Sequence, residues 1–136
     1  MYPPEIVMPM KHDITSAGVK ELLTPEDVDA AITAKGTALV FINSVCGCAA
    51  GNARPSIKMA LKHSKLPTRM TTVFAGFDVA AVAQARKYMA PYPPSSPCIA
   101  LFKDGNLVHF IERHHIEGRT PEMIVENLTG AFDEFC

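Results

Sequence analysis

The sequence has 136 residues, of which 48% are hydrophobic and 20% are charged, and its formal net charge is −1. This composition is that of an ordinary soluble protein, and the length suffices for one domain with a real core. Without a basic excess to bind a phosphate backbone, we expect no nucleic-acid partner.

The sequence shows no targeting signal and no membrane-spanning segment. No apolar run approaches the roughly 18 residues that a membrane span needs. The N-terminal residues Met1–Ile6 lack the basic and apolar regions of a signal peptide. We therefore expect a cytoplasmic protein without a membrane partner. Cytosolic thiols are kept reduced, so four cysteines indicate catalysis, metal binding or simple burial and not a disulfide framework.

The predicted elements alternate between helices and strands. Residues 1–23 show weak periodicity, and we expect an N-terminal arm that packs irregularly or as a short helix. Apolar periodicity, caps and β-forming runs then predict the rest. In order, these are a helix from Pro25 that Thr24 caps and Gly36 ends, a strand over 37–43, a helix over 49–61, a strand over 70–74, a helix over 79–89 capped by Asp78, hairpin strands over 98–102 and 107–111, and a helix from Pro121 capped by Thr120.

This order predicts an α/β fold. Strand–helix alternation favours parallel crossovers, and the hairpin adds an antiparallel pair. We expect a central four-stranded mixed sheet with helices on both faces and an extra N-terminal helix. No linker divides the chain, so residues 1–136 are expected to form a single domain.

Cys46-Gly47-Cys48 is the motif that points to chemistry. It lies between a strand that reads as buried on both faces and the start of a helix. The thiolate is the reactive form of cysteine, and the N–H groups and dipole at a helix start stabilise it. We therefore expect a lowered pKa for Cys46. No carboxylate occurs from Thr37 to Val45, so the motif and its strand contain no acid or base.

The single-residue spacing affects the disulfide that the pair can form. Cα atoms two residues apart can come within disulfide range in a turn, but side chains with this spacing on a helix do not face each other. Closing the ring is expected to strain the backbone, and Gly47 would relieve part of that strain through its wider φ/ψ range. A strained disulfide is more oxidising, which favours exchange or isomerisation over deep reduction.

Other interpretations of the cysteines remain open. Cys46 and Cys48 can be structural, or two ligands of a metal that normally takes about four, with His114 and His115 completing the site. Cys98 is expected to be a small buried hydrophobe or an accessory thiol near the pair. Cys136, the last residue, is expected to be an exposed and oxidisable tail thiol.

The whole pattern resembles known redox proteins. The order β-α-β-α-β-β-α, the Cys motif after the first strand and Ser96-Pro97 before the hairpin resemble the thioredoxin core. The narrower resemblance is to the bacilliredoxin family, along nearly the whole chain. It is carried by Asn43-Ser44-Val45-Cys46-Gly47-Cys48-Ala49-Ala50-Gly51, Thr72-Val73-Phe74-Ala75-Gly76, Tyr92-Pro93-Pro94-Ser95-Ser96-Pro97, Ala100-Leu101-Phe102-Lys103-Asp104-Gly105, Arg113-His114 and Ile116-Glu117-Gly118.

The resemblance implies a cytosolic thiol–disulfide oxidoreductase that removes bacillithiol, or a similar small thiol, from client proteins. Cys46 would be the nucleophile and Cys48 its resolving partner, with the small thiol as co-substrate, S-thiolated proteins as partners and no permanently bound cofactor. Weak disulfide isomerase or reductase activity is a further implication, and we expect a monomer or weak homodimer. Thioredoxins carry a buried Asp near the first strand, so proton handling must differ here.

Two further expectations concern the surroundings of the thiols. Pro97 is expected to follow a cis peptide, because the loop must turn sharply there and cis bonds are tolerable only before proline. A backbone group of Ser96 would then pair with a substrate chain, beside Gly47. Phe77 stands where the family pattern suggests a polar residue, and it is expected to alter the rim of the site.

Overall fold

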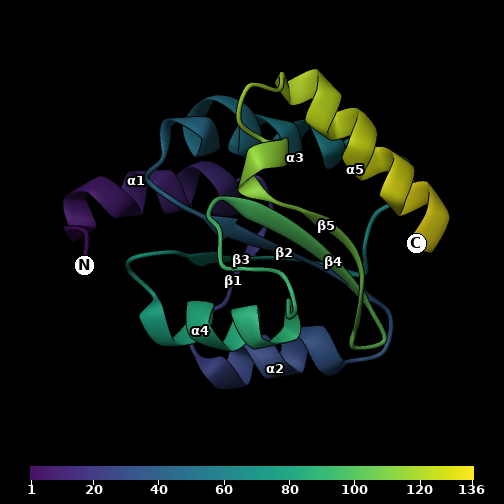
Figure 1. The fold of residues 1–136 in the computed structure, drawn as a ribbon, viewed down its shortest axis with the longest axis horizontal. Coiled ribbons are helices and arrows are strands. Elements are labelled where there is room, and N and C mark those ends of the chain that lie inside the picture. The colour runs from purple at the N-terminus through teal and green to yellow at the C-terminus, as the bar shows by residue number, and fades with distance from the viewer.

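A mixed five-stranded sheet forms the middle of three layers in the computed structural model, which describes residues 1–136 (Figure 1). The strand order is β1-β3-β2-β4-β5. The first three of these neighbours run parallel, and β4 is antiparallel to both β2 and β5. The strands are β1 (Lys20–Glu21), β2 (Thr37–Asn43), β3 (Arg69–Phe74), β4 (Cys98–Lys103) and β5 (Asn106–Ile111).

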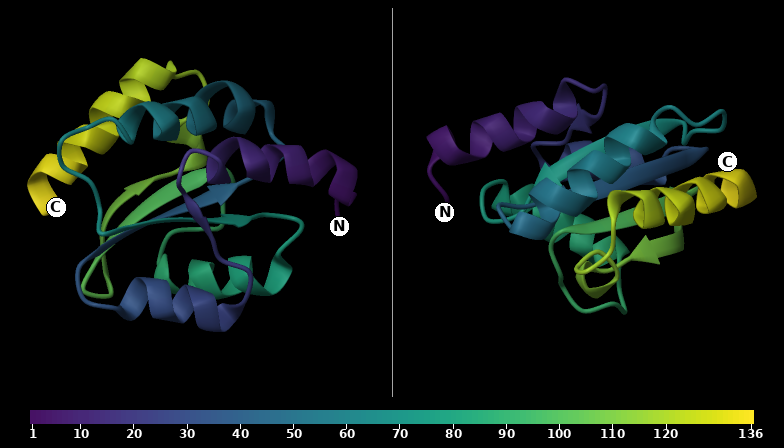
Figure 2. Two further views of the ribbon diagram at one scale, coloured as in Figure 1. Left: turned by 180° about the vertical axis from the view of Figure 1, so that it is seen from behind. Right: turned by 90° about the horizontal axis from the view of Figure 1, so that it is seen from above.

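Helices cover both faces of the sheet. Figure 1 shows α1, α3 and α5 on one face and α2 and α4 on the other, and the view from behind in Figure 2 shows the same layers. The two chain ends lie at opposite ends of the three-helix layer. The helices are α1 (Pro4–Thr15), α2 (Pro25–Thr33), α3 (Arg54–Ala60), α4 (Val79–Tyr88) and α5 (Pro121–Phe135), with short turns η1 (Ala49–Ala53) and η2 (Arg113–His115).

Strand β2 is the centre of the core, and all seven of its residues are buried. Alternate side chains point to opposite faces of a strand. Phe41 accordingly packs in the cluster that contains Ile57 of α3, and Val40 packs in the cluster that contains Val28 of α2. Each fully buried side chain of this size contributes about 1.5–3 kcal/mol relative to exposure. The strand that carries the thiols at its end is therefore held from both sides.

The predicted α/β architecture is confirmed, and one strand was missed. The four predicted strands and the helices that follow them are present, and Thr24 and Thr120 cap α2 and α5 as expected. The sheet nevertheless has five strands, because β1 pairs in parallel with β3. Of the two forms expected for residues 1–23, the helix is confirmed, since this segment contains the twelve-residue helix α1, and β1 is the strand that was not predicted.

A buried lysine attaches this N-terminal segment to the sheet. Lys11 of α1 pairs with Glu21 and with Asp78, whose carboxylate lies 2.7 Å from the lysine Nζ. The lysine is 6% exposed. Asp78 is the N-cap residue of α4, as predicted, but its side chain makes no capping bond to the helix. Its carboxylate instead compensates the buried charge of Lys11, which would be costly unpaired.

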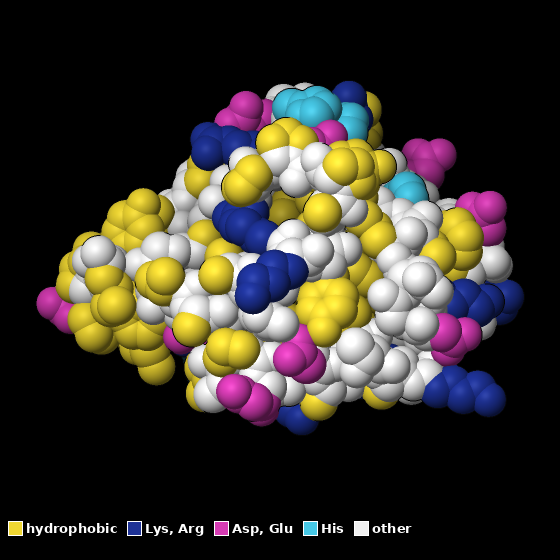
Figure 3. All heavy atoms as spheres, turned by 60° about the horizontal axis from the view of Figure 1, so that its bottom comes forward, with side chains coloured by type: hydrophobic (Ala, Val, Ile, Leu, Met, Phe, Trp, Pro, Cys, Tyr) yellow, Lys and Arg dark blue, Asp and Glu magenta, His cyan; other side chains and the backbone are white.

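The face of the molecule drawn in Figure 3 has no large patch of a single charge. Basic and acidic side chains are interspersed there. Hydrophobic side chains gather at the left, the end at which α1 begins, and Met1, Tyr2 and Ile6 are exposed. None of the helices combines the length and apolar character needed to span a bilayer.

Candidate active site

The loop after β2 is fixed in place by a buried arginine. Arg54 is 5% exposed, and its Nη1 donates to Asn43 Oδ1 at 3.0 Å and to the Ser44 carbonyl at 3.1 Å. Ser44 Oγ in turn accepts the Cys46 backbone N–H at 3.2 Å. Charge-assisted hydrogen bonds of this kind are stronger than neutral ones. Hydrogen bonds within the chain therefore hold the backbone that presents Cys46.

The helix after the thiols begins irregularly. The predicted single helix over 49–61 is instead a π-helical turn, η1, that leads into α3. The Arg54 N–H reaches back five residues to the Ala49 carbonyl. Pro55 follows immediately and has no N–H to continue the regular pattern. Such π turns occur frequently at functional sites.

The two sulfur atoms form a close and unequal pair. Cys46 Sγ and Cys48 Sγ are 2.7 Å apart, both thiols are free, and both residues are half-buried. Hydrogen bonding from Cys48 lowers the pKa of Cys46 below its ordinary value, with smaller help from the backbone N–H groups of Cys48 and Ala49. Burial raises the pKa of Cys48 to about 11. Of the two thiols, Cys46 therefore loses its proton first, and Cys48 stays protonated at neutral pH.

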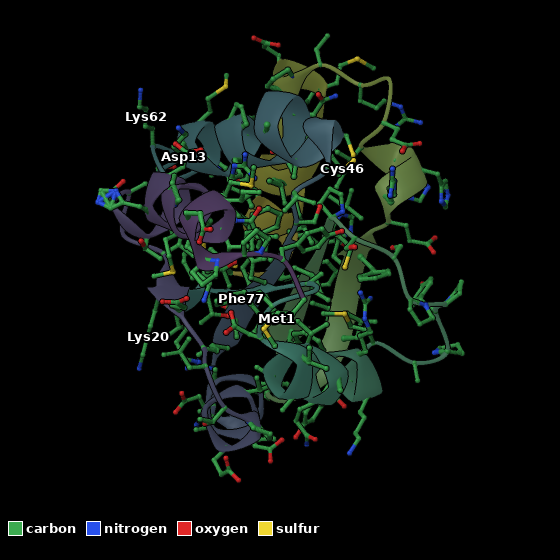
Figure 4. The ribbon with its side chains drawn as sticks, turned by 90° about the vertical axis from the view of Figure 1, so that its left-hand side faces the viewer. Met1, Asp13, Lys20, Cys46, Lys62 and Phe77 are labelled. Carbon is green, nitrogen blue, oxygen red and sulfur yellow. The ribbon has the colours of Figure 1, made fainter.

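Helix-start stabilisation of Cys46, expected from the sequence, is thus only part of the cause. The neighbouring thiol contributes most to the lowered pKa of Cys46, and the positive charge of Arg113 also contributes. Figure 4 shows Cys46 between the start of the teal helix and the yellow-green turn that contains η2. A segment far along the chain therefore forms the second wall of the site.

That second wall carries an arginine and a glutamate. Arg113 Nε donates to Glu117 Oε1 at 2.6 Å, and its Nη1 donates to the Ser96 carbonyl at 3.3 Å. Glu117 has a carboxylate oxygen within 4.8 Å of both sulfur atoms. The Arg113 charge favours both thiolates, whereas the Glu117 charge raises the pKa of Cys48. Opposite charges therefore face one thiol pair.

Asn52 joins the two walls. Its Nδ2 donates to the Ile116 carbonyl at 3.1 Å and to the Arg119 carbonyl. Asn52 lies in η1, directly after the thiols, while both carbonyls flank Glu117 in sequence. The position of Glu117 is thereby coupled to the turn that carries Cys48.

The predicted substrate-binding residues surround the pair in different ways. The Ser96–Pro97 peptide is cis, as expected. The Ser96 carbonyl accepts from Arg113, so this group is already engaged within the chain. Gly47 is exposed, lacks a positive φ, and has no atom within 4 Å of the place where a Cβ would stand. With free thiols, Gly47 therefore does not adopt a glycine-only conformation, and no neighbouring side chain covers it.

The remaining cysteines lie in contrasting positions. Cys98 is fully buried in the cluster under α2 and α4, whereas Cys48 packs against the cluster on the opposite face of the sheet. Burial raises the pKa of Cys98 to about 12. Cys136 is exposed at the end of α5. The sheet thus separates Cys98 from the pair, and an accessory role for either thiol stays a prediction.

Phe77 does not contribute to the rim of the thiol site. Its ring lies 4.8 Å from the Lys11 Nζ, and Figure 4 shows it near Met1, well away from Cys46. The expected effect on the rim is therefore wrong. Phe77 instead covers the buried lysine of α1, and a cation over a ring face is a favourable contact.

Potential metal ligands form two separate groups. Cys46, Cys48 and Glu117 are one, and Glu112, His114 and His115 are the other. The two histidines, considered from sequence as partners of the thiols, thus group with a different carboxylate. Glu117, Arg113 and Asn52 received no role from sequence. The only signal for the first two was their presence in the Arg113-His114 and Ile116-Glu117-Gly118 words of the family pattern.

Comparison with known proteins shows which family this chain belongs to. A family described as "Disulphide isomerase" matches residues 2–136. The Bacilliredoxin of Cytophaga hutchinsonii is 59% identical over 134 residues, covering 98% of this chain and 99% of its own. The chain belongs to the bacilliredoxin family. A second bacilliredoxin, BH1716 of Halalkalibacterium halodurans, is 52% identical over 136 residues and matches 99% of this chain and 94% of its own.

Solved structures support the fold of this bacilliredoxin family member. Mitochondrial thioredoxin 3 from Saccharomyces cerevisiae, in its oxidised form, superposes with a TM-score of 0.60 at 15% identity, covering 87% of this chain and 98% of its own. Thioredoxin from Aeropyrum pernix gives 0.57 at 17% identity, with coverage of 80% and 84%. The fold is thioredoxin-like. Together with the family, it identifies a thiol–disulfide oxidoreductase.

Proposed function

We propose that this protein removes small thiols from client proteins, with Cys46 as the nucleophile and Cys48 as the resolving thiol. The observation that carries the proposal is the unequal pair: a half-buried Cys46 whose pKa is lowered, in contact with a Cys48 whose pKa is about 11. Bacillithiol, or a similar low-molecular-weight thiol, is the proposed co-substrate. The cytoplasm, where such mixed disulfides form, is the proposed location.

The first step is an attack by the Cys46 thiolate on the mixed disulfide of a client. A bond forms between Cys46 Sγ and the sulfur of the small thiol, and the bond from that sulfur to the client cysteine breaks. The client leaves as a thiolate, which takes a proton from water. The client is reduced, and Cys46 now carries the small thiol. Arg113 favours this step because its charge stabilises the attacking thiolate.

Regeneration follows in one of two ways. A free molecule of the small thiol can attack the adduct and release a small-molecule disulfide. Alternatively Cys48 attacks Cys46, which frees the small thiol and leaves a Cys46–Cys48 disulfide for an external reductant. Neither route needs a resident cofactor. The client chain would lie against the cis-Pro97 loop, near Ser96 and the exposed, uncrowded Gly47.

The proposal is tested with a client protein that carries a bacillithiol mixed disulfide, followed by mass spectrometry. Cys46→Ser should abolish de-thiolation, and Cys48→Ser should accumulate an adduct on Cys46. Cys136→Ser is the matched control, since it removes an exposed thiol at the far end of α5 and should leave the rate unchanged. An undiminished rate for Cys46→Ser would contradict the mechanism. The same client carrying a glutathione disulfide tests the identity of the small thiol.

General disulfide isomerisation is a second candidate, favoured by the name of the matching family. A thiolate that attacks readily, next to a protonated partner that resolves slowly, suits reshuffling of wrong disulfides as well as de-thiolation. The test uses a scrambled-disulfide substrate whose activity returns on correct pairing. Failure of wild-type protein to restore that activity, while it still de-thiolates a client, would remove this candidate.

A metal carrier is the third candidate, because Cys46, Cys48 and Glu117 offer three ligand atoms within 4.8 Å of one another. Two thiolates and a carboxylate are known ligand types for zinc. Metal analysis of protein purified under reducing conditions decides the question. Stoichiometric zinc or copper that is lost in the Cys46/Cys48 double variant would favour the carrier, and metal-free active protein would exclude it.

A further inference from the structure

The resolving thiol needs a proton acceptor that its own strand does not provide. Cys48 must lose its proton to attack Cys46, yet burial raises the pKa of Cys48 to about 11, so it is almost wholly protonated at neutral pH. Strand β2 and the loop up to Val45 contain no carboxylate. In contrast, the second wall of the site brings Glu117 within 4.8 Å of both sulfur atoms. This separation is what a single bridging water spans.

We propose that the Glu117 carboxylate takes the Cys48 proton as Cys48 attacks a mixed disulfide on Cys46, and then passes that proton to the departing small thiolate. This inference rests on the proposed function, of which it specifies the resolving step. A Cys46–Cys48 bond forms, and the bond from Cys46 to the small thiol breaks. The two cysteines are oxidised and the small thiol is reduced. Its sulfur leaves with the electron pair and receives the proton from Glu117, which ends ionised as it began.

The surroundings of Glu117 suit a proton acceptor for Cys48. Arg113 Nε holds one of its oxygens at 2.6 Å, and the other oxygen has no hydrogen bond within the chain. Half of the Glu117 side chain is exposed, so a water can reach it. Asn52 fixes the backbone on both sides of Glu117 to the turn that carries Cys48. The acceptor is thus held beside the donor without being sealed off.

Glu117 can act on Cys48 in a second way, through its negative charge alone. The groups concerned are Arg113, Glu117 and the two sulfur atoms themselves. A Glu117 that acted only through its negative charge would hinder deprotonation of Cys48, because that charge disfavours a second anion nearby. Removing the charge would then speed closure of the disulfide. Removing a proton acceptor would slow it, so the two roles predict opposite signs.

The experiment measures closure in a single turnover. In a Cys136→Ser background, Cys46 is first converted to a mixed disulfide with 2-mercaptoethanol or with thionitrobenzoate. Release of the small thiol by Cys48 is then followed by stopped flow. Glu117→Gln is compared with wild type and with Glu117→Asp. Glu126→Gln, an equal charge change on the exposed side of α5, is the control.

For the 2-mercaptoethanol adduct at pH 7, Glu117→Gln should close at least about tenfold more slowly, since positioned acid–base groups contribute about 10²–10⁴-fold. The deficit should shrink as the pH approaches that of Cys48 ionisation, and Glu117→Asp should recover part of the rate. Thionitrobenzoate leaves readily as an anion, so the deficit should be smaller with that adduct. Glu126→Gln should match wild type.

Closure of Glu117→Gln at the wild-type rate or faster would overturn the proton-acceptor role. Equal deficits for the two leaving groups would overturn transfer to the departing thiolate. Both outcomes differ from failure of the proposed function, which would show as wild-type protein that forms no mixed disulfide at Cys46. A Cys46 adduct that forms normally but closes independently of residue 117 therefore contradicts only the inference drawn from Glu117.

Discussion

Strand β2 and the segment from Arg113 to Arg119 contribute to the same thiol site in opposite ways. The strand is buried over its whole length and supplies position, because both faces of the sheet and the Arg54 hydrogen bonds fix the loop that follows it. The segment is largely exposed and supplies charge through Arg113 and Glu117. The thiols are thus placed by one part of the chain, while the charged side chains around them come from another.

Changes in the strand should therefore unfold the protein, and changes in the segment should alter reactivity while the fold persists. Phe41→Ala tests the contribution of the buried strand to stability, and it should have the largest effect. Phe41 is fully buried against α3, so the substitution should lower the free energy of unfolding by about 3–5 kcal/mol. Urea denaturation measures the loss. A loss below about 1 kcal/mol would mean that the strand does not anchor the site.

Asn52→Ala tests the connection between the two regions. The change removes two hydrogen bonds to the segment, and a net loss of about 1–3 kcal/mol is expected from typical values for such bonds. Disulfide closure by Cys48 should slow as well, since Glu117 is no longer held beside it. Stopped-flow closure and urea denaturation on the same sample separate these effects. Lost stability with unaltered closure would show that Asn52 serves the fold alone.

Asp13→Asn tests a smaller electrostatic contribution at the other side of α3. Lys58 donates to Asp13 at 2.7 Å and lowers the pKa of Asp13, with Arg54 contributing. Because the folded state holds the lower pKa, this stability is present above the unfolded pKa and is lost as pH falls through the folded one. The side chain is 39% exposed, so the loss at pH 7 should stay under about 1 kcal/mol.

The readout for Asp13→Asn is the difference in unfolding free energy from wild type at pH 7 and at pH 3. The difference should narrow at pH 3, which lies below the ordinary pKa of an aspartate, because Asp13 is then largely protonated in the unfolded chain. A difference that stayed constant with pH would show that the ion pairs of Asp13 do not stabilise the fold.

Arg113→Gln tests the charge of the exposed segment by itself. Arg113 lies on the surface, so the free energy of unfolding should not change. Its charge helps to lower the pKa of Cys46, so the variant should react with iodoacetamide along a pH profile displaced to higher pH. Lys62→Gln, a neutralised lysine beyond the end of α3, is the control and should keep the wild-type profile. Coincident profiles for Arg113→Gln and wild type would remove the arginine from the account.

The sequence predicted the buried scaffold well because local pattern and burial agree there. The apolar run of β2 and the threonine caps of α2 and α5 specify their elements within a few residues. Strand β1 was missed because two residues are too few to show the alternation of apolar and polar side chains that marks a strand. Only its pairing with β3 makes this segment a strand. The π turn was missed because residues 49–61 were expected to form one regular helix.

The candidate site divides in the same manner. Cys46 and Cys48 were evident from their spacing and from the strand before them. The roles of Arg113 and Glu117 were not, since both lie more than 60 residues later in the chain and reach the thiols only after the hairpin folds back. No local pattern encodes that approach. The missing strand carboxylate indicated that proton handling differs, and the structure supplies a carboxylate from a different element.

The central claim is that Cys46 alone is the reactive thiolate of an unequal pair. Iodoacetamide labelling of reduced protein across pH, with each cysteine assigned by mass spectrometry of its peptides, tests this directly. We predict that Cys46 labels with a midpoint below the ordinary thiol pKa, while Cys48 stays unlabelled until strongly alkaline pH and Cys98 stays protected. Equal labelling of Cys46 and Cys48 over the same pH range would contradict the account.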